Sequence, residues 1–270
     1  MIDLVSALVV GALLCFSAGL GMFISPRLPP AHRGHETVEM MTLATGMLVT
    51  FAALVLGLIT ASVKAGYDEA VRNRQHYALQ LTELDQCLRN YGPGADTARA
   101  YLRSYTAAII ASVWPSEPPP TGMSYPDTSG THQLVITGAV PAFAGLVNRV
   151  GLELSRFSPT DPVLMHIADS CRQIYRDVAD ARLLVLETEN EEAGLSTPFY
   201  RILVFWLMVI FASFGLIAPR HNLSVISIIL CAVSLSTAIF VIVDLSRPYD
   251  GLFSVSSATM RTALGSMLRP

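Results

Sequence analysis

The sequence predicts an all-α protein with four transmembrane helices and a large helical domain inserted between the second and third of them. Three observations lead to this fold class. Only 14% of the 270 residues are charged, whereas soluble globular proteins carry about 25%. Four runs without any charge are each long enough to form a membrane helix. The charges are also concentrated, because residues 64–198 hold 27 of the 39 charged residues.

The four charge-free runs have the lengths that membrane helices need. A helix requires about 20 apolar residues to cross roughly 30 Å of hydrocarbon, with a range of about 17 to 25. The third run is the shortest, and we expect its helix to begin near Tyr200. The first run lacks a basic start, so we expect a retained helix and not a cleaved signal. In chain order the runs are Leu4–Ser25, Met40–Val63, Ile202–Ala218 and Leu223–Val243.

The spacing of apolar residues within residues 64–198 predicts a helical domain. Apolar residues at alternating spacings of three and four indicate helices over 67–90 and 161–192 with coiled-coil-type seams. A further helix is expected over 96–114, and another should begin just after Pro141. Residues 115–130 are proline-rich and predict a loop. The seams are Tyr77, Leu81, Leu84, Leu88 and Tyr91 in the first helix, and Leu164, Ile167, Cys171, Ile174, Val178, Ala181 and Val185 in the second.

The predicted organisation therefore has four parts. Residues 1–63 form a first transmembrane hairpin, with helices over about 4–25 and 40–63, and residues 64–198 form the helical domain. Residues 199–243 form a second hairpin, with helices over about 200–218 and 223–243. Residues 244–270 form a membrane-proximal tail, in which Val255, Met260, Leu264 and Met267 indicate a short amphipathic helix.

Basic residues predict the orientation of this arrangement. With four spans, both termini and residues 64–198 share one side of the membrane. Near the membrane that side carries seven basic residues and the other side three, so the positive-inside rule places the termini and the 64–198 domain in the cytoplasm. Cys87 and Cys171 agree with a reducing compartment provided that they are unpaired. The seven are Lys64, Arg72, Arg74, Arg182, Arg201, Arg247 and Arg261, and the three are Arg27, Arg33 and Arg220.

The sequence contains no recognisable catalytic constellation. It lacks a glycine-rich phosphate loop, a GxSxG elbow, a CxxC pair and an HExxH motif, so we expect neither an enzyme nor a bound cofactor. His32, His35 and Glu36 lie together in a proline-rich loop that would not pre-organise ligands, and no metal site is expected. A net charge of −3 argues against nucleic acid as a partner. The expected partners are the lipid bilayer, further copies of the chain and inorganic ions.

Small and hydroxyl-bearing residues follow one face of the second span, and a similar row lies on the fourth. Such faces let helices pack closely, and they equally suit the wall of a pore for partly dehydrated ions. Both interpretations are open from the sequence. No span contains a charge, which argues against a proton-coupled pump. The candidate pore-lining residues are Thr42, Thr45, Gly46, Val49, Thr50, Ala53 and Gly57, and the row on the fourth span is Ser224, Ser227, Cys231 and Ser234.

Two polar segments beside the spans are further candidates. Asp244, Arg247, Pro248, Asp250 and Gly251 follow the fourth span. Arg247 is three residues from each acid, so its guanidinium could bridge both, while the proline and the glycine would turn the chain. This tail either anchors to its own subunit or packs on a neighbouring one. In the turn between the third and fourth spans, Arg220 and His221 are either ordinary polar turn residues or a positive mouth that attracts anions.

The C-terminal part of the chain resembles a known family. The patterns VFWL…FASFGL.AP over residues 204–219 and D.SRP..G…VSSA..R.AL over residues 244–264 are similar to the signature of a bacterial membrane family with a bestrophin-like domain. This resemblance extends more distantly to bestrophins, which are pentameric ion channels with four membrane helices per subunit and a cytosolic helical region. It implies a homo-oligomer in the bacterial inner membrane, and the likeness to bestrophins implies that the oligomer is a pentamer.

The chain departs from animal bestrophins at two points. Phe51 is the only aromatic residue of the second span, so the aromatic neck of those channels has no counterpart. Asp244 and Asp250 are too few to supply the six to eight oxygen ligands of calcium. The sequence therefore predicts a passive ion channel or pore without calcium gating. The alternative is a non-conducting membrane-anchored scaffold or sensor, which would act through the long helices of its cytoplasmic domain.

Overall fold

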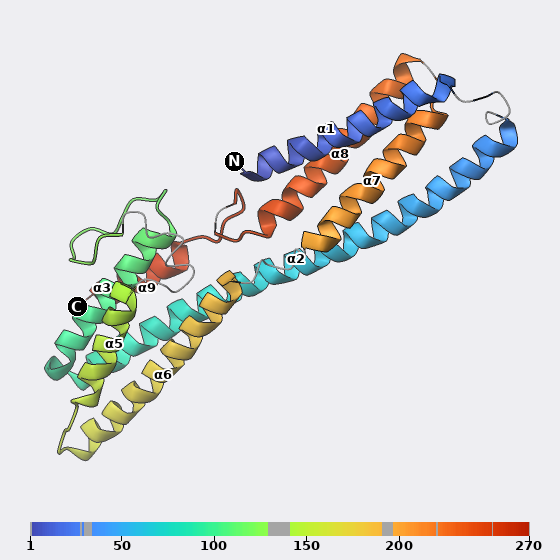
Figure 1. The fold of residues 1–270 in the computed structure, drawn as a ribbon. Coiled ribbons are helices and arrows are strands. Elements are labelled where there is room, and N and C mark those ends of the chain that lie inside the picture. The colour runs from blue at the N-terminus through green and yellow to red at the C-terminus, as the bar shows by residue number, and fades with distance from the viewer. Residues whose placement is uncertain are drawn as a thin grey trace. The chain divides into compact units, whose positions relative to one another are not determined.

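The computed structural model is all-helical over the residues that it describes, which are 2–27, 29, 34–128, 141–190, 197–219, 221–249 and 251–269. None of these residues forms a strand, so the predicted all-α class is confirmed. Short 3₁₀ turns at Ser25–Arg27 and Pro93–Ala95 accompany the helices. The α-helices are α1 (Ile2–Ile24), α2 (His35–Tyr91), α3 (Asp96–Val113), α5 (Pro141–Ser155), α6 (Pro162–Asn190), α7 (Thr197–Ile217), α8 (Asn222–Leu245) and α9 (Ala258–Leu268), shown in Figure 1.

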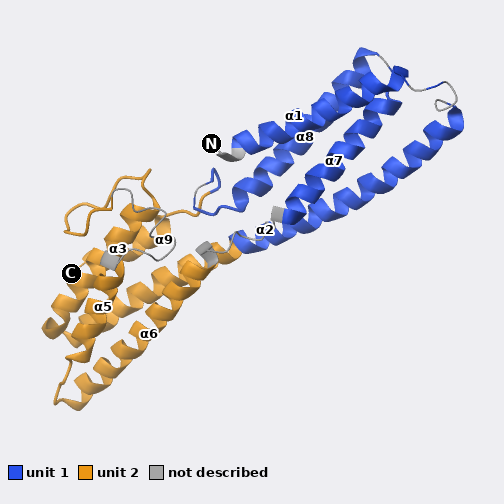
Figure 2. Ribbon diagram, in the orientation of Figure 1, with its two compact units in different colours: residues 1–67, 192–253 blue, residues 68–191, 254–270 orange. Residues whose placement is uncertain are grey.

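The chain divides into two compact units. Unit 1 contains residues 1–67 and 192–253, and unit 2 contains residues 68–191 and 254–270 (Figure 2). Helix α2 contributes to both, because it is a single helix of 57 residues. The segments predicted separately as a span over 40–63 and a helix over 67–90 are thus parts of one helix. No proline lies between them, and Gly66 alone weakens a helix without ending it.

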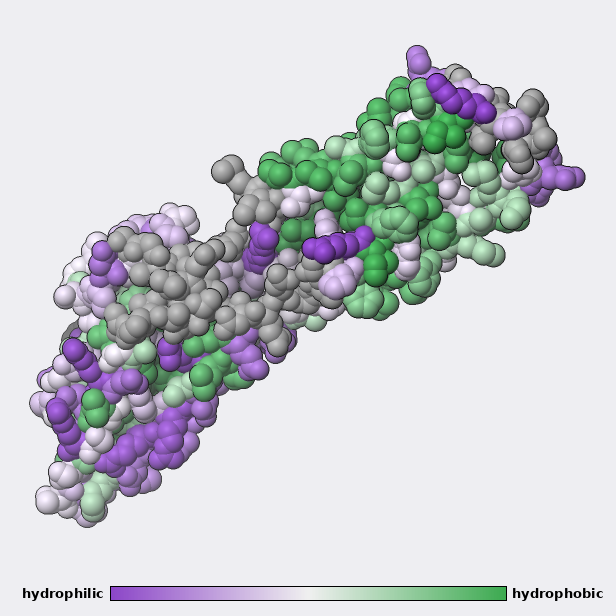
Figure 3. Space-filling view, in the orientation of Figure 1, coloured by the Kyte–Doolittle hydropathy of each residue, from purple (hydrophilic) through white to green (hydrophobic). Residues whose placement is uncertain are grey.

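Unit 1 contains the helices suited to a membrane. Four described helices, α1, α2, α7 and α8, are long and apolar enough to cross a bilayer by length and composition. Hydrophobic residues cover the face of unit 1 that is visible in Figure 3, whereas hydrophilic residues gather over unit 2. The outward side chains include Leu8, Phe16 and Leu230, each more than half exposed. Such a surface is stable in hydrocarbon and not in water.

Two glycines bring the backbones of α1 and α7 together. A Cβ atom at Gly215 would overlap the carbonyl oxygen of Ala18, and one at Gly21 would overlap that of Ala212. Each helix therefore requires a residue without a side chain at this crossing. Close approach of this kind is a principal source of helix association in membranes, where the hydrophobic effect does not drive it.

Two serines of α1 and the turn after it reinforce the same contact. The Ser17 hydroxyl donates to the carbonyl oxygen of Met208 at 2.6 Å, and the Ser25 hydroxyl donates to that of Leu216 at 3.0 Å. Both bonds join segments that are 191 residues apart in the sequence. Each serine hydroxyl donates to one particular backbone oxygen of α7. The two bonds therefore fix the register between α1 and α7 as well as holding the helices close together.

Unit 2 is built around the apolar seams that the sequence predicts. Tyr77, Leu81, Leu84 and Leu88 of α2 are buried, as are Cys171, Val178, Ala181 and Val185 of α6. Near this core the hydroxyls of Tyr77 and Tyr105 form a hydrogen bond of 2.6 Å. Burial raises the pKa of the Tyr105 phenol, so it remains neutral.

A disulfide between Cys87 and Cys171 joins α2 to α6. The sequence argument for a reducing compartment required these two thiols to be unpaired, and the structure does not meet that condition. The distribution of basic residues is then the remaining argument for the location of this unit. The other two cysteines, Cys15 and Cys231, are free thiols in unit 1.

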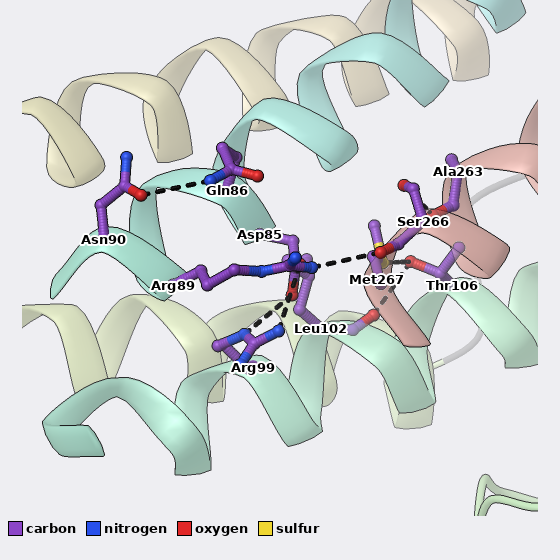
Figure 4. Close-up of polar contacts among 10 residues, drawn as sticks. All are labelled: Asp85, Gln86, Arg89, Asn90, Arg99, Leu102, Thr106, Ala263, Ser266 and Met267. Atoms are coloured by element: carbon purple, nitrogen blue, oxygen red, sulfur yellow. Dashed lines mark hydrogen bonds and ion pairs between the residues drawn. The ribbon is translucent and has the colours of Figure 1, made fainter. Parts of the chain in front are cut away.

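A buried carboxylate joins three helices of unit 2 (Figure 4). The Asp85 side chain of α2 is 3% exposed and accepts from Arg99 Nε of α3 at 3.1 Å and from Arg89 Nη2 at 3.1 Å. The same nitrogen of Arg89 donates to the backbone oxygen of Ser266 in α9 at 3.1 Å. The sequence analysis did not identify Asp85, because its two arginines lie 4 and 14 residues away and only the fold brings the second one close.

Replacing Gly215 with alanine is expected to destabilise unit 1. The added Cβ overlaps a backbone oxygen of α1, so the helices must separate, at a cost of about 1–3 kcal/mol. We expect a lower midpoint of thermal unfolding for the purified protein in detergent. Gly19→Ala is the matched control, since a Cβ there meets no atom within 4 Å. Equal midpoints for the two variants would contradict the contact.

Replacing Asp85 with alanine is expected to destabilise unit 2 by about 3 kcal/mol, because two arginines then lose their buried carboxylate. Asp169→Ala is the control: its carboxylate is 75% exposed and pairs with Arg172 at 2.7 Å, a type of pair worth less than about 1 kcal/mol. Thermal unfolding followed by near-ultraviolet circular dichroism measures both. A smaller loss for Asp85→Ala than for Asp169→Ala would show that the cluster does not stabilise the unit.

Candidate functional site

Helix α2 presents three faces in unit 1. The first face is buried and includes Thr45 and Ala52. Ala52 belongs to the hydrophobic core that also contains Leu203, Leu207 and Phe211 of α7. The second face is exposed and carries large apolar side chains, namely Met40, Leu43, Met47, Leu54 and Leu58. The third face carries small and hydroxyl-bearing residues and is exposed as well.

The third face contains most of the residues that the sequence proposed for a pore. Two of its members directly follow residues of the buried face, in Thr45–Gly46 and Ala52–Ala53. One residue corresponds to a rotation of about 100° around the helix. Thr45 itself is only 5% exposed and lies on the buried face. The structure thus places one of the seven candidates on a different face. The six exposed candidates are Thr42, Gly46, Val49, Thr50, Ala53 and Gly57.

The threonines of the third face share one hydrogen-bond geometry. The hydroxyls of Thr42, Thr50 and Thr60 each donate to the backbone oxygen four residues earlier, at 2.8, 3.0 and 2.7 Å. A hydroxyl has one hydrogen and two lone pairs. Because each hydroxyl hydrogen is used in a bond to the backbone of the same helix, the lone pairs of the oxygen remain available to accept hydrogen bonds from outside the helix. This face therefore presents acceptors and methyl groups.

A cavity of about 630 Å³ lies between α2, α7 and α8. From α2 it is lined by Thr42, Thr45, Gly46 and Val49, four of the predicted pore-lining residues. The predicted row on the fourth span forms another wall through Ser224, Ser227 and Cys231. The C-terminal end of α7 contributes Phe214 and Ile217 to the lining. The structure does not bring Thr50, Ala53 or Gly57 to this cavity.

His221 caps α8 at the edge of the cavity. Its Nδ1 accepts a hydrogen bond from the backbone N–H of Ser224 at 3.3 Å and lies 3.2 Å from the hydroxyl of the same serine. A side-chain acceptor at this position satisfies one of the N–H groups that a helix start leaves unpaired. Of the two predicted outer-turn residues, His221 thus has a structural role, while Arg220 lies outside the described residues.

Asp244 organises the turn after α8. Its carboxylate is buried and accepts from the backbone N–H groups of Leu252 and Phe253, both at 2.8 Å. Gly251 packs directly against it, since a Cβ there would meet the Asp244 side chain at 2.8 Å. Arg247 is exposed and Pro248 is buried. Asp250, the second acid of the predicted Arg247 bridge, lies outside the described residues.

The tail helix α9 packs within its own unit. Met260, Ala263, Leu264 and Met267 are buried there. Before the helix, Trp114 Nε1 of the α3 end donates to a backbone oxygen at Val255, at 2.7 Å. Arg261 Nε of α9 pairs with Glu117 at 2.8 Å. These contacts supply the attachment to the same subunit that was one of the two interpretations of the tail.

No metal centre is apparent in the described part of the chain, where no three His, Cys, Asp or Glu side chains gather in a way that could hold an ion. His32, a member of the metal-like group in the sequence, lies outside the described residues. Sequence reasoning missed the cavity, although the hydroxyl rows of both helices were visible. Nothing in either row indicates that the two converge.

Comparisons with known proteins agree on one family. A family model described as a bestrophin-like domain matches residues 12–260. Crystal structures of variants of a bacterial bestrophin homologue from Klebsiella pneumoniae are similar to this chain. One has 14% identity and a TM-score of 0.64, and covers 97% of this chain and 98% of that one. Another has 12% identity and a TM-score of 0.66, with 98% and 96% covered. At such identities the likeness concerns the fold. No curated protein sequence matches.

Replacing Asp244 with alanine is expected to loosen the turn that follows α8. The N–H groups of Leu252 and Phe253 lose their side-chain acceptor, so their amide exchange should accelerate by about tenfold or more. Hydrogen–deuterium exchange of the peptide that contains both residues measures this. Asp244→Asn keeps one carbonyl acceptor and should have a smaller effect. Unchanged exchange in the alanine variant would contradict the assigned role.

Proposed function

This chain belongs to the bestrophin-like domain family, and from that membership we propose that it forms a homo-oligomer in the membrane that conducts ions passively. By the distant resemblance to bestrophins the oligomer is a pentamer, with α2 of each subunit around a central axis. The four apolar helices of unit 1 cross the bilayer. Residues 64–198 and both termini lie in the cytoplasm, in accordance with the bias of basic residues.

One observation carries this proposal: the third face of α2 is exposed in the single chain. A Cβ atom at Gly46 or Gly57 would meet no atom within 4 Å, so the chain itself places nothing against these positions. In a ring of subunits the helix nearest the axis must have small side chains, because large ones would close the passage. The third face meets this requirement along several turns. The large apolar face of α2 then meets lipid or the adjacent subunit.

The hydrogen-bond geometry of the threonines favours cations over anions. Anions are bound by donors, whereas the Thr42 and Thr50 hydroxyls give their hydrogens to backbone oxygens of their own helix. The lone pairs that remain suit a partly dehydrated cation. No charged side chain lies between residues 40 and 63. Neutral oxygens of this kind replace the hydration of a monovalent ion more readily than that of a divalent one.

Purified protein in liposomes is expected to pass sodium ions and to exclude chloride. Ala53→Leu places a large side chain on the third face and should reduce the sodium flux by about tenfold or more. Ala61→Leu makes the same change on the large apolar face of the same helix, and its flux should equal that of the unmodified protein. Both positions are exposed, so the two variants differ in the face and not in burial.

Several outcomes would contradict the proposal. A detergent-solubilised particle with the mass of one subunit would exclude a ring. Equal loss of flux in the two leucine variants would show that the third face does not line the pore. A chloride flux larger than the sodium flux would contradict the proposed preference for cations over anions. Absence of flux for any ion would favour the membrane-anchored scaffold.

A further inference from the structure

The disulfide between Cys87 and Cys171 conflicts with the location proposed for the domain that contains it. The bond joins α2 to α6 in unit 2, and the proposed function places residues 64–198 in the cytoplasm. Cytoplasmic thiols are kept reduced, and the disulfides that do form there are usually transient and belong to catalytic or redox-sensing pairs. The bond and the location agree if the pair alternates between a reduced and a bonded state.

Unit 2 holds the two cysteines close together independently of the bond. Their Cα atoms are 5.5 Å apart, a separation that a disulfide bridges without movement of the backbone. The same two helices bury Leu84 and Leu88 of α2 and Val178 of α6, and burial of these apolar side chains does not depend on the oxidation state of sulfur. The bond can therefore form and break within the folded unit.

The reduced state also provides a partner for its thiol. Cys87 Sγ lies 3.6 Å from the backbone oxygen of Ile167, which is one turn before Cys171 on α6. A thiol is a weak hydrogen-bond donor, so the Cys87 thiol can donate to this oxygen once it is reduced. In the bonded state Sγ has no hydrogen and its partner is the sulfur of Cys171. Each oxidation state thus has a contact for Sγ in the same geometry.

The two sulfurs differ in their access to solvent. Cys87 is 8% exposed, whereas Cys171 is 0% exposed, so a small thiol reaches the sulfur of Cys87. Its thiolate forms a mixed disulfide with Cys87, and Cys171 leaves as a thiolate that takes up a proton. A second small thiolate then attacks the sulfur of the first, and Cys87 leaves and is protonated in the same way. Two small thiols become one small disulfide, and oxidation of the pair is the reverse reaction.

We propose that Cys87 and Cys171 form a thiol–disulfide switch that responds to small thiols and disulfides of the cytoplasm, of which glutathione is the chemical type. Oxidation ties α2 to α6 covalently, and reduction releases this link. Helix α2 is continuous from His35 to Tyr91, so the bond acts on the helix that also carries the third face. The inference rests on the cytoplasmic location in the proposed function and not on conduction.

Titration of the purified full chain in nanodiscs tests the switch. The variant with Cys15→Ser and Cys231→Ser is used, because the chain has four cysteines and this variant retains only the pair. Samples are equilibrated with mixtures of reduced and oxidised glutathione, quenched with acid, unfolded and alkylated with a maleimide, and adducts are counted by mass spectrometry. We expect two adducts in reduced glutathione, none in oxidised glutathione, and a return to two when the sample is reduced again.

Hydrogen–deuterium exchange measures what the bond does to the fold. Reduction should accelerate amide exchange in the peptides of α2 and α6 around the pair by about threefold or more, because the bond no longer restricts local opening. Cys87→Ser should exchange at the faster rate in both reduced and oxidised glutathione. Cys231→Ser is the matched control and should respond to glutathione as the unmodified protein does.

Trapping of the thiols in intact bacteria tests the switch at its proposed location. After rapid acid quenching, growing cells should contain the reduced pair, and diamide, an azo oxidant that takes up the two hydrogens, should convert it to the disulfide. Val163→Cys reports the location separately, since Val163 is 66% exposed on α6. A membrane-impermeant maleimide should label this variant only after the cells are permeabilised.

Four results would overturn the switch. A pair that stays bonded in excess reduced glutathione is a structural disulfide, and a pair that stays reduced in diamide-treated cells is not a redox couple. Equal exchange in the two states would show that the bond does not alter the fold. Labelling of Val163→Cys in intact cells would place unit 2 outside the cytoplasm. Absence of ion flux in liposomes would contradict conduction alone and leave the switch intact, so the two failures are distinguishable.

Discussion

The close crossing of α1 and α7 is the contact on which the membrane unit depends. In a bilayer, apolar surface gains little by being buried between helices, so association relies on packing and on polar bonds. Gly21 and Gly215 allow backbone contact, and Ser17 and Ser25 bond across it. Since α1 packs on both α7 and α8, this crossing positions three of the four apolar helices together.

The position of α2 follows from that arrangement. It joins the core of α1, α7 and α8 through side chains such as Leu48, Ala52, Leu56 and Ile59. Its Gly46 and Gly57 face open space and make no backbone contact of the α1–α7 kind. Side-chain packing without backbone contact leaves two faces of the helix exposed and a cavity near its N-terminal end. The features with functional interest therefore lie on the helix that is packed least closely.

Unit 2 has a different physical basis. Its helices bury apolar seams as in a water-soluble bundle, and a disulfide and a buried carboxylate add specific links between them. Asp85 connects α2, α3 and α9, while Arg261 and Trp114 attach the tail to α3 and the residues after it. Replacing such a carboxylate is costly because the arginines around it stay buried or partly buried. The C-terminal tail is thus an integral part of this unit.

By itself the sequence determined the fold class, the four membrane-length helices and the helical seams, because composition and periodicity are local properties that folding preserves. The family was indicated separately, by the resemblance of the C-terminal patterns. The sequence also identified the hydroxyl rows of α2 and α8. Only the tertiary structure decided that Thr45 lies on a different face from Gly46, that the two rows converge on one cavity, that Cys87 pairs with Cys171 and that Asp85 meets Arg99. Each of these depends on the rotation and distance between helices far apart in the chain, which no local pattern encodes.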